Sequence, residues 1–135
     1  MEEVRFTSNN DGTADAQQGG AIYMLSGTLD LDTISFANFH AATHGGAIVS
    51  EGGTFTDVIF TGNHAGADDG GAIRNTVAAL TIDGTSNTFS NNYTANGSGD
   101  YGGTIYSSAN LTVSDAAFTS NDDATADAQQ GGAIF

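Results

Sequence analysis

Three histidines and a set of carboxylates are the side chains of this sequence that could bind a metal ion. His40 and His64 each lie four positions after a phenylalanine of a repeated motif, so stacked repeats would place them side by side. His44 and the pair Asp68-Asp69 lie close to them in the sequence. Imidazole and carboxylate groups together suit Zn²⁺ or a similar ion. Surface histidines at equivalent loop positions explain the same pattern more plainly, so these five residues are only weak metal candidates.

Other loops carry carboxylates that could attract calcium, which takes about six to eight oxygen ligands. The acidic groups are Asp11 with Asp15, Asp68 with Asp69, and Asp122-Asp123 with Asp127. The Gly-Gly-x-Gly-x-Asp signature of calcium-binding β-rolls is missing. We therefore expect no cofactor and, at most, weak Ca²⁺ binding that relieves charge repulsion.

Two short motifs alternate along the whole chain and must position these side chains. Gly-Gly-Ala-Ile, with one Gly-Gly-Thr-Ile variant, occupies Gly19–Ile22, Gly45–Ile48, Gly70–Ile73, Gly102–Ile105 and Gly131–Ile134. Phe-x-x-Asn occupies Phe6–Asn9, Phe60–Asn63, Phe89–Asn92 and Phe118–Asn121. In the remaining unit Phe36 is followed by Asn38, one place early. Repeats of roughly 25 to 30 residues predict a stacked array rather than a domain with one central core.

The repeats predict an all-β fold. They are rich in Gly, Thr, Asn, Ser and Asp, which are poor helix formers, and they lack the apolar period of a helix. Apolar and polar residues alternate instead, as in Leu29-Asp30-Leu31, which is typical of a strand with one buried face. Gly-Gly and the motif asparagine suit left-handed corners. We predict a parallel β-helix of four to five coils of about 25 to 32 residues, with three short strands per coil. The crossover rule makes it right-handed.

Coils stacked in register should form three internal ladders. One is built from Ile22, Ile48, Ile73, Ile105 and Ile134. The second is built from Phe6, Phe36, Phe60, Phe89 and Phe118. The third is built from Asn9, Asn63, Asn92 and Asn121, whose amides can hydrogen-bond from coil to coil.

A longer period overlies the coils. Residues 5–22 and 117–134 align with three mismatches over eighteen positions, at a separation of 112 residues. We interpret residues 1–135 as a single array without separate domains, made of one four-coil super-repeat plus its overlap with the next. The parent protein would then be longer, or copies would stack through their end coils.

The composition excludes several classes of partner. Two Lys and Arg residues against sixteen Asp and Glu give a net charge of −14, which argues against binding nucleic acid through a basic patch. No stretch is apolar enough to span a membrane, and the absence of Cys excludes disulfides. If the parent is exported, its signal peptide and anchor lie outside this sequence.

An enzymatic function is not expected. Parallel β-helices include polysaccharide-active enzymes, which need positioned carboxylates. Asp68-Asp69 and Thr43-His44-Gly45 suggest such a site only faintly, because adjacent residues of a strand point to opposite sides. Ice binding through a threonine array is also disfavoured, since Asp30 and Asp83 interrupt the threonine rows.

The alternation of Gly-Gly-Ala-Ile with Phe-x-x-Asn over essentially the whole chain resembles the repeats of the polymorphic outer-membrane proteins. That resemblance implies a right-handed β-helix exported as an autotransporter passenger, displayed on the bacterial surface and used for adhesion. The sequence departs from the family in having no Lys or Cys and an unusually regular super-repeat. Adhesion is therefore a fold-level analogy.

We expect a structural and adhesive, surface-displayed or secreted repeat module, with a receptor on a host or neighbouring cell as partner. The alternative is a self-assembling extracellular fibre subunit that stacks head to tail. A polysaccharide-active enzyme is a remote third alternative.

Overall fold

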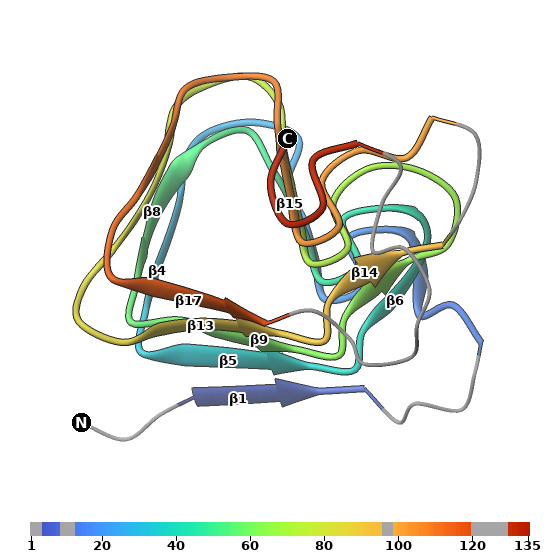
Figure 1. Cartoon of the computed structure of the whole chain (residues 1–135), viewed down its shortest axis with the longest axis horizontal. Coiled ribbons are helices and arrows are strands. Elements are labelled where there is room, and N and C mark those ends of the chain that lie inside the picture. Colours follow the sequence, from blue (N-terminus) through green and yellow to red (C-terminus); the bar gives the residue numbers. More distant parts are fainter. Residues whose placement is uncertain (1–3, 9–12, 96–98, 120–129) are drawn as a thin grey trace.

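The chain passes repeatedly through four parallel sheets, which enclose a solenoid (Figure 1). The structure is a computed structural model and describes residues 4–8, 13–95, 99–119 and 130–135. Its described residues form strands and turns and no helix. None of these residues belongs to a helix that is long and apolar enough to cross a membrane.

Sheets A and B meet at one corner of the coil. Sheet A contains β1 (Val4–Thr7), β5 (Ile34–Ala37), β9 (Ile59–Thr61), β13 (Asn87–Ser90) and β17 (Ala116–Thr119). Sheet B contains β2 (Ala16–Gln18), β6 (His40–His44), β10 (His64–Ala65) and β14 (Tyr93–Thr94).

Sheets C and D complete each coil. Sheet C contains β3 (Ile22–Tyr23), β7 (Ile48–Ser50), β11 (Ile73–Asn75) and β15 (Ile105–Ser107). Sheet D contains β4 (Leu29–Asp32), β8 (Gly53–Thr56), β12 (Leu80–Asp83) and β16 (Leu111–Val113). All pairings between these strands are parallel, so the expected parallel β-helix is confirmed.

Each coil has four strands rather than the three expected from the sequence. The additional strands are those of sheet B, in the segment after Phe-x-x-Asn that reads as a polar loop. Their inward side chains are small, as at Ala41 and Ala65, which are fully buried. Small side chains give a weak hydrophobic signal, yet the backbone hydrogen bonds of a parallel sheet do not depend on side-chain size.

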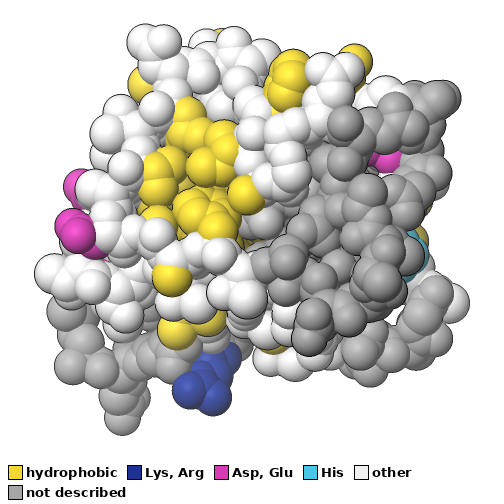
Figure 2. Space-filling model, viewed as in Figure 1, with side chains coloured by type: hydrophobic (Ala, Val, Ile, Leu, Met, Phe, Trp, Pro, Cys, Tyr) yellow, Lys and Arg dark blue, Asp and Glu magenta, His cyan; other side chains and the backbone are white. Residues whose placement is uncertain are grey.

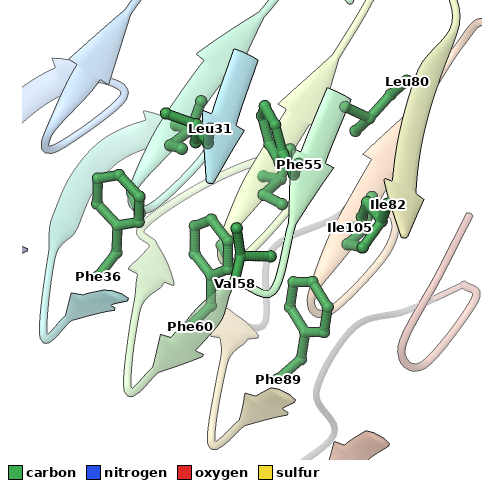
Figure 3. Close-up of a cluster of buried hydrophobic side chains, with 13 residues drawn as sticks. Leu31, Phe36, Phe55, Val58, Phe60, Leu80, Ile82, Phe89 and Ile105 are labelled. Carbon is green, nitrogen blue, oxygen red and sulfur yellow. The ribbon is translucent and has the colours of Figure 1, made fainter. Parts of the chain in front are cut away.

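The register between coils stacks equivalent side chains. Phe6, Phe36, Phe60, Phe89 and Phe118 pair in order along sheet A, with successive ring centroids 5.1, 5.1, 5.3 and 4.7 Å apart. Ile22, Ile48, Ile73 and Ile105 pair along sheet C, and Ile134 continues this row through a bridge to Ile105. Figure 3 shows Phe36, Phe60 and Phe89 in a row, facing Leu31, Phe55 and Ile82 from sheet D. The core is therefore a column of stacked layers.

The two glycines of each Gly-Gly pair have different roles. Gly45 has a φ of 56°, in the left-handed region that glycine adopts without steric cost. At Gly46 the constraint is space, because a Cβ atom there would collide with the carbonyl oxygen of Gly71 and lie 2.5 Å from the amide nitrogen of His64. The first glycine turns the chain, and the second lets neighbouring coils approach.

The residue that turns the chain after the Phe ladder is the second after each phenylalanine. Asn38, Gly62 and Asn91 occupy this position, with φ angles of 64°, 65° and 55°. The motif asparagine, one residue later, was expected in the corner, but Asn63 and Asn92 point into the coil and are buried. Asn38 is thus a corner residue in its regular place, and Phe39 replaces the ladder asparagine in that coil.

Candidate functional site

Three side chains at the start of sheet B form a stack of rings on the outside of the corner between sheets A and B. The backbone register places His64 beside His40 on one side and Tyr93 on the other. The imidazole centroids of His40 and His64 are 3.7 Å apart, and the rings of His64 and Tyr93 are 4.7 Å apart at an angle of 9°. We call this set, His40, His64 and Tyr93, the ring stack.

A pocket of about 150 Å³ lies between the ring stack and the corner residues. It is lined by Ser8, Thr13, Asn38, His40, Gly62, His64 and Tyr93. Gly62 contributes no side chain, whereas Asn38 and Asn91 occupy the same position in the adjacent coils. The missing side chain opens the corner at this coil.

Burial, the larger cause, and the charge of neighbouring His40 together lower the pKa of His64 to about 4. A second imidazole stacked on the first leaves less room for water around a charge. His64 is therefore neutral at pH 7, with one ring nitrogen that donates a hydrogen bond and one that accepts.

A separate polar cluster lies at the other end of β6 and around β11. His44 Nε2 is 3.9 Å from Asp68 Oδ2, and His44 Nδ1 is 3.9 Å from Asp69 Oδ2. Asp69 Oδ2 also lies 3.6 Å from Nε of Arg74, whose guanidinium carbon is 5.8 Å from the Tyr106 ring centroid. We call His44, Asp68, Asp69 and Arg74 the ionic cluster.

Burial is the main cause of the pKa shifts in the ionic cluster. It lowers the pKa of His44, with Arg74 acting in the same direction and the two aspartates opposing. It raises the pKa of Asp69, and His44 and Arg74 oppose that rise. The cluster is thus a partly buried network of opposite charges that already contains its own cation.

The five weak metal candidates are divided between these two groups. The rings of His40 and His64 are stacked with their planes inclined by only 25°, and their nitrogen lone pairs lie in those planes, an arrangement that does not direct both rings toward one ion. His44, Asp68 and Asp69 have Arg74 beside them, whose charge opposes cation binding. In the described ranges, no three His, Cys, Asp or Glu side chains are grouped so that they could hold one metal ion.

The calcium candidates are also accounted for in part. Asp15 accepts hydrogen bonds from the Ser8 hydroxyl at 2.7 Å and the His40 amide at 2.9 Å, so its carboxylate is engaged within the fold. Asp11, Asp122, Asp123 and Asp127 lie outside the described residues, as do Asn9, Asn10 and Asn121.

Asn63 and Asn92 form a buried amide ladder at the same corner. Asn63 Nδ2 donates to Asn92 Oδ1 at 2.9 Å and to the Phe36 carbonyl at 3.1 Å. Asn92 Nδ2 donates to the carbonyl of Phe60 at 2.9 Å. These bonds cross three coils and fix the start of sheet B, and with it the ring stack.

Two further buried asparagines were missed from the sequence. Asn75 Nδ2 donates to Ser107 Oγ at 3.1 Å, while its Oδ1 accepts from Ser50 Oγ at 3.2 Å. Asn87 Oδ1 accepts from the Val58 amide at 3.0 Å. The signal for Asn75 was its alignment with Ser50 and Ser107, two residues after each ladder isoleucine.

Comparison with protein families places one segment of the chain. Residues 57–76 match the family model of the Chlamydia polymorphic membrane protein repeat. The matched segment contains Phe60–Asn63 and Gly70–Ile73, so the resemblance expected from these motifs is confirmed. No curated protein and no solved structure matches the chain. The match indicates a surface-associated β-helical protein.

Proposed function

We propose that this chain is a stretch of a rigid rod displayed on a bacterial cell surface, and that the sides of the rod adhere to another cell. The proposal rests on the family match of residues 57–76 together with the continuous in-register stacking of the coils. A column of buried Phe and Ile rows gives stiffness without a catalytic centre. The outer faces are then free to vary, because outward residues do not contribute to the column.

The pocket beside the ring stack is the observation that favours adhesion over a purely structural role. A stalk needs buried rows, corners and solubility, and none of these requires a pocket whose described lining has six polar or aromatic side chains. Side chains in loops and at corners are where repeat proteins place their binding contacts.

Adhesion is tested with beads coated with the purified chain. We expect the beads to bind a subset of cell types in a panel of epithelial and bacterial cells, and soluble chain to compete. The control is an equally acidic globular protein at the same coating density, because a net charge of −14 alone alters bead attachment. Attachment equal to the control on every cell type would contradict the proposal.

We propose no catalytic role. Asp69, one of the two adjacent carboxylates considered for catalysis, is paired with His44 and Arg74. Incubation of the chain with polygalacturonate should therefore release no reducing sugar, and measurable release would support a hydrolase instead.

The second candidate is a fibre subunit that stacks head to tail. It is favoured by the large apolar side chains that are exposed in the first and last coils. Val4 and Phe6 are 52% and 41% exposed, and Ile134 and Phe135 are 37% and 49% exposed. Figure 2 shows apolar side chains gathered on the face of the stack toward the viewer, inside a border of polar surface. Function would then depend on contacts between end coils.

A further inference from the structure

We propose that the pocket beside the ring stack binds one ring of a neutral carbohydrate. This inference rests on the proposed adhesive function and names the class of ligand that the lateral face would recognise. A volume of about 150 Å³ has room for a single sugar ring rather than for a larger organic molecule.

The charge of the pocket favours a neutral ligand. Among the residues that the structure describes, none of the seven that line the pocket is a Lys, Arg, Asp or Glu. The carboxylate of Asp15 accepts hydrogen bonds from two lining residues, the Ser8 hydroxyl and the His40 amide, and is engaged within the fold. An anionic ligand would gain no cation here and would enter the field of a chain with net charge −14. A cationic ligand would find no carboxylate among the lining residues within the described part of the chain.

The lining chemistry matches hydroxyl groups, which both donate and accept hydrogen bonds. Imidazole, carboxamide and hydroxyl groups have the same dual capacity. Within the described part of the chain, the imidazole nitrogens of His40 and His64 make no hydrogen bond. Neutral His64 can therefore present both a donor and an acceptor at the pocket wall.

The pocket wall is also fixed before a ligand arrives. His64 is held between two rings, and the backbone beneath it is held by Asn63, which is fully buried. Rings that cannot rotate lose little conformational entropy on binding, so even a small number of contacts gives measurable affinity.

Gly62 creates the space for the sugar. The left-handed corner position that it shares with Asn38 and Asn91 accepts asparagine. A Cβ atom on Gly62 would lie 2.7 Å from Oδ1 of Asn38, the end of a side chain that can rotate away. Gly62→Asn therefore fills the pocket with the residue that the adjacent coils already carry, without requiring a new backbone conformation.

The test is a titration of ¹⁵N-labelled chain with the methyl glycosides of glucose, galactose and N-acetylglucosamine, followed by NMR. We expect saturable shifts at Gly62, His40 and His64 for at least one glycoside, with a dissociation constant on the order of 1 to 10 mM. Gly62→Asn should weaken that binding by about tenfold or more. His64→Phe, which keeps a stacked ring but removes both nitrogens, should weaken it similarly.

Thr81→Ala, on the outer face of sheet D, is the matched control and should bind as the original chain does. The inference is overturned if none of the three glycosides shifts these signals. It is also overturned if Gly62→Asn and His64→Phe bind as tightly as the unsubstituted chain.

Bead adhesion separates this inference from the proposed function. If beads coated with Gly62→Asn attach to cells as well as unsubstituted beads do, the rod is adhesive but the pocket is not the contact, and the inference fails alone. If neither bead attaches while the glycoside titration succeeds, the pocket binds sugar and the adhesive function fails.

Discussion

Asn91 and Asn92 are adjacent residues of the same type with different structural roles. Asn91 turns the chain with a φ of 55°. Asn92 is 1% exposed, and its side chain bonds to Asn63 and to the carbonyl of Phe60. One asparagine is present for its backbone and the other for its amide group.

Because the two roles differ, substitution by glycine should have a small effect on stability at one position and a large effect at the other. Asn91→Gly should change the free energy of unfolding by less than about 0.5 kcal/mol, because glycine adopts positive φ readily. Asn92→Gly should cost about 2 to 4 kcal/mol, because it leaves buried groups of Asn63 and Phe60 without partners. Urea denaturation of both variants measures the two values. Equal losses would show that the roles assigned to the two residues are wrong.

The low pKa of His64 predicts acid sensitivity. The folded-state pKa of about 4 lies below the ordinary value of 6.5, so the unfolded chain takes up the proton first as the pH falls. The stability contributed by neutral His64 is complete above about pH 6.5 and is lost progressively between 6.5 and 4. His44 acts in the same direction, while the raised pKa of Asp69 acts in the opposite one.

His64→Phe removes this titration and keeps a stacked ring. We expect its unfolding midpoint to fall less between pH 7 and pH 4.5 than that of the unsubstituted chain. An NMR titration of the His64 ring gives the pKa directly, and a value near 6.5 would contradict the prediction.

At the residue scale, sequence reasoning found the repeat positions but not always their roles. The motif asparagine was expected in the corner because asparagine is one of the few residues that tolerate positive φ. In the structure the residue before it has positive φ. This residue is Asn38, Gly62 and Asn91 in three successive coils. Identity alone could not separate the two positions, since both carry asparagine at Asn91 and Asn92.

The Phe ladder contains interior and end positions that differ only in their neighbours. Phe60 is fully buried between Phe36 and Phe89, whereas Phe6 stacks on Phe36 alone and is 41% exposed. A cavity forms only where coils enclose the site on both sides.

We therefore expect Phe60→Ala to lower the free energy of unfolding by about 3 to 5 kcal/mol and Phe6→Ala by about 1 kcal/mol. Chemical denaturation of both variants tests this comparison. A loss at Phe6 as large as that at Phe60 would mean that the first coil is enclosed in solution, for example by another copy of the chain.

At the element scale, three of the four sheets could be predicted because each carries a large buried residue. Sheets A, C and D are marked by Phe60, Ile73 and Ile82, and their rows follow from motif spacing alone. Sheet B has alanine or threonine at the inward position and histidine or tyrosine outside, a pattern that sequence reasoning cannot tell from a loop. The ring stack belongs to this sheet, so its contacts became visible only in the structure.

The charge of the whole chain bears on its stability. A net charge of −14 on 135 residues makes the folded state repel itself. We expect 0.3 M NaCl to raise the melting temperature, because exposed charges are screened at that ionic strength. If Ca²⁺ also binds the acidic loops weakly, a few millimolar CaCl₂ should raise it further than NaCl of equal ionic strength. If the two salts raise the melting temperature equally at equal ionic strength, charge screening explains the whole effect and Ca²⁺ does not bind.

The sheets of the solenoid differ in their number of strands, and this bears on self-assembly. Among the described strands, sheet A has five and sheet D has four. In a stack of two copies, β1 of the second would pair with β17 of the first and continue the Phe ladder from Phe118 to Phe6. Counted from the first copy, β16 is the fourth strand of sheet D. The β4 strand of the second copy would lie two layers above β16, in the sixth layer. One layer of sheet D would be empty, with unpaired strand edges on both sides.

For copies of residues 1–135, simple head-to-tail stacking therefore leaves backbone groups unpaired at each junction, which opposes filament growth. We expect electron microscopy of the purified chain at neutral pH to show short discrete particles, with or without Ca²⁺. Five layers at a strand spacing of about 4.8 Å make the stack roughly 24 Å tall. Long uniform filaments would contradict this expectation. They would mean that the junction is repaired by a rearranged end coil, and they would favour the fibre function over the adhesive rod.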